Sequence, residues 1–121
     1  MASEDFRKRT FEFGIRCIRL VESLPKTMVA QTLGKQLLRS ATSVGANYRS
    51  AVRARSRSEF VAKMGVVEEE CDETLHWIEV LLASGFLKES LVKDPQREGS
   101  ELLAICVQSI KTARKNAKNT R

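Results

Sequence analysis

Apolar residues recur along most of the chain at spacings of three, four and seven residues, which is the pattern of amphipathic helices. The first such segment runs from near Ser3 to Ser23. Its apolar positions are Phe6, Phe13, Cys17, Leu20, Val21 and Leu24. Pro25 ends this helix, because a proline disfavours helical backbone in the residue before it. Thr27 is expected to cap a second helix, which the pattern extends to about Arg53.

A third and a fourth helix follow from capping signals. Ser56 and Glu59 have the spacing of a capping box, which predicts a helix start, and Gly85 is a typical helix terminator. The expected core positions between them are Phe60, Met64, Val67, Cys71, Leu75, Ile78 and Leu82. Asp94 followed by Pro95 predicts the start of the fourth helix, since a missing N–H costs nothing at the first helical position. Its apolar face continues through Leu102 or Leu103, Cys106, Ile110 and Ala113.

These segments predict an all-α protein. The 121 residues suffice for one domain spanning 1–121, and the basic carboxyl-terminal segment 111–121 is expected to fray. Aromatic residues are few, and no alternating strand pattern, repeat or low-complexity tract is present. Because the connections are short, we expect an antiparallel up-down-up-down bundle of four helices, with the second and third as neighbours.

The second helix is unusual because its residues sort into three sectors rather than two when they are placed at about 100° per residue. An apolar sector contains Leu33, Leu37, Ala41, Val44, Tyr48 and Val52. A stripe of short polar side chains contains Gln36, Ser40, Ser43 and Asn47. A basic sector contains Lys35, Arg39, Arg49, Arg53 and Arg57. The polar stripe predicts a second packing contact, to a helix or a subunit, which leaves the basic sector for an anion.

The distribution of charge along the chain also points to this basic sector. The net charge of +6 divides into +8 over residues 1–58, −6 over 59–99 and +4 over 100–121. Arginines three or four residues apart on one helix suit successive phosphates, because each guanidinium donates two parallel hydrogen bonds. The cationic surface is expected to extend to Arg55, Lys111, Arg114, Lys115 and Lys118. Two alternatives are a solubilising basic face and neutralisation by the acidic third helix, within the bundle or between subunits.

Other classes of chemistry find little support in the sequence. Cys17, Cys71 and Cys106 form no C-x-x-C pair and are expected to be core thiols rather than disulfide or zinc ligands. Glu73-x-x-His76 has the spacing of half a di-iron site, but His76 is the only histidine, so no metal and no cofactor are expected. Trp77 is expected to pack rather than to stack a base. The chain has no phosphate-binding loop or nucleophile elbow, so neither an enzyme nor a small-molecule substrate is predicted.

The sequence also gives an expectation about location. No uninterrupted apolar stretch approaches the length of a membrane span, and no signal-peptide pattern is present. We therefore expect a cytoplasmic protein without a membrane partner.

The central string QL-x-RSA-x-SV-x-AN, from Gln36 to Asn47, also carries a resemblance. Together with Pro25-Lys26, Glu59-Phe60 and an acidic third helix, it resembles the bacterial proteins encoded in intervening sequences of 23S rRNA genes, which are related to accessory proteins of diversity-generating retroelements. The similarity extends from about Phe6 to Lys115. One departure follows Asn47, where members commonly have Glu-Gly and this chain has a helical, cationic sequence, YRSA.

This resemblance implies a left-handed four-helix bundle that assembles as a homopentamer, with a role in binding RNA or a nucleic-acid-associated partner and no catalytic residues. The leading hypothesis is therefore a non-enzymatic RNA-binding accessory protein, whose assembly multiplies one weak basic stripe into a cationic ring. The rival hypothesis is a protein-interaction scaffold in which the basic stripe pairs with the acidic third helix inside the oligomer.

Overall fold

The computed structural model describes residues 3–119, which fold into four helices and, within that range, no strand. The helices are α1 (Ser3–Glu22), α2 (Met28–Ala51), α3 (Arg57–Ala83) and α4 (Glu89–Asn119). The all-α prediction is confirmed. Helix α2 packs against α1 and α3, and α3 also packs against α4, whereas contact between α1 and α4 is sparser. None of the described helices is both long and apolar enough to span a bilayer.

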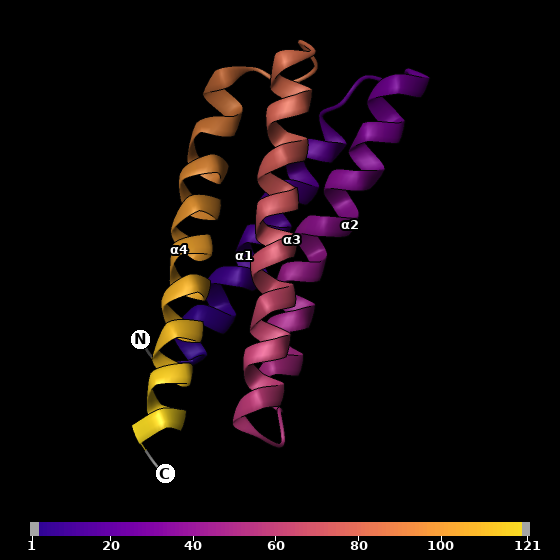
Figure 1. Cartoon of the computed structure of the whole chain (residues 1–121). Helices are drawn as coiled ribbons and strands as arrows, with labels where there is room; N and C mark the ends of the chain where they lie inside the picture. The colour runs from indigo at the N-terminus through magenta and orange to yellow at the C-terminus, as the bar shows by residue number, and fades with distance from the viewer. Residues whose placement is uncertain (1–2, 120–121) are drawn as a thin grey trace.

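The loops lie at alternating ends of the bundle. Figure 1 shows the α1–α2 and α3–α4 connections at the top of the view and the α2–α3 connection at the bottom. The amino-terminal part of α1 and the carboxyl-terminal part of α4 also lie toward the bottom. The end of α2, the start of α3 and the end of α4 are thereby brought to one end of the molecule.

The predicted capping signals operate at the starts of α2 and α3. The Thr27 hydroxyl accepts a hydrogen bond from the Ala30 N–H at 3.2 Å, and the Ser56 hydroxyl accepts one from the Glu59 N–H at 3.1 Å. The Glu59 carboxylate returns to the Arg55 N–H at 3.4 Å, one residue earlier than an ideal capping box. Gly85 has a φ of +81°, as a helix terminator of this type requires.

The predicted start of α4 at Asp94 is wrong. The helix begins at Glu89, and Pro95 lies inside it. Proline removes one backbone hydrogen bond from a helix. The additional turn nevertheless forms because it buries Val92 completely, and the flanking residues Leu87 and Pro95 are buried as well. Burial of several apolar side chains offsets the loss of a single hydrogen bond.

The core contains most of the predicted apolar positions, including the three cysteines, all of which are buried free thiols. Burial raises the pKa of Cys17 to about 12 and that of Cys106 to about 12, so these thiols are protonated at neutral pH. Two core positions were misplaced. Leu81 rather than Leu82 is fully buried on α3, and Val52 is 44% exposed because it follows the last residue of α2.

An ion-pair cluster joins α1 to α4, the helix pair with the sparser contact. The Arg9 guanidinium donates to Glu98 at 2.6 Å and to Glu101 at 3.0 Å. Arg9 and Glu98 retain 25% and 20% of their side-chain exposure, so this contact is partly shielded from solvent. The hydrogen bond from Arg9 lowers the pKa of Glu98 against the opposing effect of burial.

Candidate nucleic-acid interface

The middle of the predicted basic stripe is neutralised inside the chain. Arg39 forms an ion pair with Glu70 of α3 at 3.1 Å and a second one with Glu73. These hydrogen bonds raise the pKa of Arg39 and lower the pKa of Glu73. Arg39 therefore bridges α2 to α3, and its guanidinium is not available to a phosphate in the same geometry.

The predicted polar stripe divides between two environments. Ser40 is fully buried, and its hydroxyl accepts a hydrogen bond from Thr74 of α3 at 3.1 Å. The Ser40 hydroxyl lies 3.2 Å from the Leu37 carbonyl, to which it donates. Ser43 and Asn47 donate to carbonyls of their own helix, and Gln36 is exposed. The helix-to-helix contact expected from the stripe is thus made by Ser40, inside one chain.

The carboxyl-terminal end of α2 differs from its middle. Arg49, Arg53 and Arg55 are exposed, and no carboxylate within the described part of the chain forms an ion pair with their side chains. Arg49 lies in the last turn of α2, where a cation also interacts favourably with the helix dipole. These guanidinium groups remain in water, where they are available to an anion.

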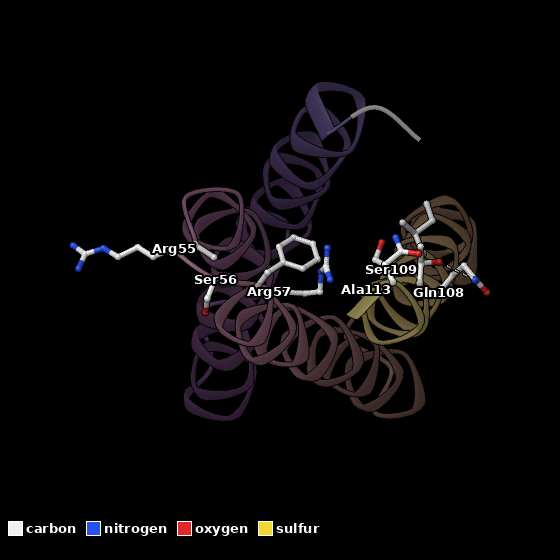
Figure 2. A pocket seen from close by; sticks show the side chains of 11 residues that line it. Arg55, Ser56, Arg57, Gln108, Ser109 and Ala113 are labelled. Carbon is white, nitrogen blue, oxygen red and sulfur yellow. Dashed lines mark hydrogen bonds between the residues drawn. The ribbon is translucent and has the colours of Figure 1, made fainter. Parts of the chain in front are cut away.

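A hollow of about 820 Å³ opens at the same end, between the start of α3 and the last turns of α4. Its lining comprises Ala54, Arg55, Ser56, Arg57, Phe60, Ile105, Gln108, Ser109, Thr112, Ala113 and Asn116. We call this hollow, with the cations around it, the basic end. Figure 2 shows Arg57 directed toward the α4 wall, where Ser109 and Ala113 lie, while Arg55 extends away from the hollow. Guanidinium, hydroxyl and amide groups are the side chains that most often contact phosphate and sugar oxygens.

The polar α4 wall of this hollow was not among the predicted site residues. Gln108, Ser109, Thr112 and Asn116 recur at helical spacing on one face of α4, and that spacing is a signal visible in the sequence. Gln108 donates to the Thr112 hydroxyl at 3.3 Å, which orders part of the wall. Only the tertiary structure places Arg57 opposite this polar face.

The remaining predicted cations lie in different places. Lys111, Arg114 and Lys115 are exposed on the part of α4 that lines or follows the hollow. The side chain of Lys118 lies outside the described residues. Lys35 is exposed but lies in the first half of α2, about 21 Å along the helix axis from Arg49 at 1.5 Å per residue. The fold therefore separates Lys35 and Arg39 from the cations of the basic end.

The Glu73-x-x-His76 pair is engaged in packing contacts. Glu73 accepts hydrogen bonds from Arg39 and, at 3.2 Å, from the indole N–H of Trp77. The exposed ring of His76 meets Trp77 edge to face, with 4.9 Å between the ring centroids. Within the described residues, no group of three or more histidine, cysteine or acidic side chains has a metal-binding arrangement.

Comparison with known proteins places this geometry in context. The family model for the 23S rRNA-intervening sequence protein matches residues 4–108. The structure is similar to the crystal structure of a protein with unknown function from the S23 ribosomal protein family of Bacteroides thetaiotaomicron VPI-5482, with a TM-score of 0.82 and 29% sequence identity. That alignment covers 88% of this chain and 98% of the other chain. No curated protein matches this chain.

Proposed function

This chain belongs to the 23S rRNA-intervening sequence protein family, and we propose that it is a non-enzymatic accessory protein that binds the phosphate backbone of RNA through its basic end. The observation that carries this proposal is that two basic segments, Arg53–Arg57 and Lys111–Lys115, meet at one end of the bundle, where residues 54–57 and 112–113 help to line one hollow. Cations and hydroxyls in this arrangement position a nucleic acid without reading its sequence.

The chemistry of the other side chains supports a binding protein rather than an enzyme. The one histidine is exposed and packs on Trp77, and the acid beside it, Glu73, already accepts from Arg39 and Trp77. The thiols are buried with raised pKa values and are therefore poor nucleophiles.

For the assembly we propose a left-handed, antiparallel bundle that forms a homopentameric ring. The alternating positions of the loops in Figure 1 support the antiparallel order, and the resemblance of the central string supports the ring. If each of five subunits contributed one phosphate contact, log affinity would fall against log salt with a slope of about −3.5 to −4.5. The cytoplasmic location expected from the sequence stays a prediction.

The test is RNA binding across a salt series by two variants with the same change in net charge. Arg53→Gln combined with Arg55→Gln removes two unpaired guanidinium groups from the basic end, whereas Lys35→Gln combined with Arg39→Gln removes two cations from elsewhere on α2. The first variant is expected to weaken binding and to flatten the salt slope by about 0.7 per lost phosphate contact and subunit. The second is expected to bind like the unchanged protein. Equal losses in both variants, or no binding at low salt, would contradict the proposal.

A protein-interaction scaffold is the second candidate. The outward face of α3 carries exposed acids, Glu69, Asp72 and Glu79, which complement a basic neighbour. If the protein is a scaffold, replacing Arg49, Arg53 and Arg57 with glutamine would dissociate the oligomer. RNA affinity would then be negligible for the unchanged protein as well as for the variant. Light scattering with and without RNA separates the two candidates, because an RNA-binding ring keeps its mass when these arginines are replaced.

A further inference from the structure

A second hollow, of about 690 Å³, runs along the outer surface between α1 and α2. It forms because the two backbones approach closely: a Cβ on Gly14 would lie 3.4 Å from the Ala41 carbonyl oxygen, and one on Gly45 would lie 3.5 Å from the Thr10 carbonyl oxygen. Larger side chains flank this crossing and leave a groove above it. Its volume lies within the range of ligand-binding sites.

The groove exposes apolar surface, including an aromatic ring. Phe11 is 63% exposed, and Ile15 and Val52, which line the same groove, are 38% and 44% exposed. Burying an exposed phenylalanine ring is favourable by about 1.5–3 kcal/mol. The surface is therefore suited to a partner with a flat or apolar face.

Cations without an ion pair in the described chain line only one side of the groove. On the α1 side, Arg7 is paired with Glu4 at 2.6 Å. On the α2 side, Arg49 and Arg53 stand one helical turn apart and have no ion pair within the described chain. A ligand complementary to this groove carries negative charge on the side that faces α2 and an apolar face on the side that contacts Phe11.

The groove is also adjacent to the basic end. Arg53 lines the groove, and Ala54 and Arg55 line the hollow at the basic end, so consecutive residues join the two sites. The two hydroxyls in the groove are already engaged, since Thr10 donates to the Arg7 carbonyl and Thr42 donates to the Leu38 carbonyl. No donor is left at these positions to select one base over another.

We infer that the groove between α1 and α2 holds unpaired bases of single-stranded RNA, which stack on Phe11 while their phosphates follow Arg49 and Arg53. This inference rests on the proposed RNA-binding function and names its substrate class. Stacking on an aromatic ring is tolerant of sequence because every base has a π-face. A duplex is excluded from this contact because its bases already stack on one another.

The test compares oligouridine with an abasic oligomer of the same length and charge. The unchanged protein is expected to bind oligouridine about 10-fold more tightly, a preference that comes from stacking alone. Phe11→Ala and Phe11→Leu are both expected to abolish that preference without lowering the affinity for the abasic oligomer. Phe11→Trp is expected to keep the preference. Met28→Ala is the matched control, because Met28 is 82% exposed at the other end of α2 and lies outside the groove.

The outcomes separate this inference from the proposed function. If both oligomers bind equally and with a strong salt dependence, the basic end binds phosphate and the stacking inference is wrong. If Phe11→Leu prefers oligouridine as the unchanged protein does, the stacking inference is wrong. It is also wrong if Phe11→Ala changes only the mass of the oligomer in solution, because the groove is then a protein-docking surface. If neither oligomer binds at low salt, the proposed function fails as well.

Discussion

The middle and the carboxyl-terminal end of α2 carry the same kind of side chain in two different roles. Arg39 lies beside α3 and is held by Glu70 and Glu73, next to the buried contact between Ser40 and Thr74. Arg53, one residue beyond the α2 C-cap, is exposed and forms no ion pair with a carboxylate among residues 3–119. The role of an arginine in this bundle therefore depends on whether a carboxylate of the neighbouring helix lies opposite it.

The largest expected difference between the two regions concerns their apolar residues. Leu37→Ala, in the fully buried middle of α2, is expected to lower the free energy of unfolding by about 2–5 kcal/mol because it leaves a cavity. Val52→Ala, at the exposed end, is expected to change it by less than about 0.5 kcal/mol. Urea denaturation of both variants measures this contrast. A similar loss in both would mean that the end of α2 is covered in solution.

A paired arginine outside α2 gives the next largest effect. Glu98→Gln removes the charge that accepts from Arg9 between α1 and α4, and it is expected to cost about 1–3 kcal/mol at neutral pH. Because the folded-state pKa of Glu98 is lowered, its contribution is complete above the unfolded pKa of about 4.3 and disappears as the pH falls through the lower folded value. Thermal unfolding of both proteins between about pH 7 and pH 3 is expected to converge at the acidic limit. A constant difference across that range would contradict an ionic origin.

The buried hydroxyl contact in the middle of α2 is expected to contribute less. Thr74→Val keeps the shape of the side chain but removes the hydrogen bond to Ser40, at a cost of about 1 kcal/mol. Thr42→Val is the control, because the exposed Thr42 hydroxyl bonds only within its own helix. Equal unfolding free energies for the two variants would show that the contact between α2 and α3 does not depend on this pair.

The smallest effects come from the arginines themselves. Arg39→Gln is expected to lower Tm slightly and to leave the salt dependence of RNA binding unchanged, because its guanidinium is already paired with α3. Arg53→Gln is expected to leave Tm unchanged and to reduce the salt slope. Calorimetry and a binding series on the same two preparations measure both properties. The opposite pattern would show that Arg39, and not Arg53, is available to RNA in solution.

The helices were predictable because their signals are local. Thr27, Ser56 and Gly85 act within one turn of their own positions, and apolar spacing identifies most of the buried face of each helix. The start of α4 was not predictable in this way, since a favourable N-cap at Asp94 competes with burial of Leu87 and Val92, which depends on the other helices.

By itself, the sequence determined the number and approximate limits of the helices, the burial of the three cysteines and membership of the family. Only the tertiary structure decided which cations are paired. Glu70 and Glu73 are 31 and 34 residues away from Arg39, and no local spacing shows that they reach it. Only the tertiary structure places Arg57 opposite the polar face of α4. The physical reason is the same in both cases, because electrostatic interactions depend on distance in space and not on separation in sequence.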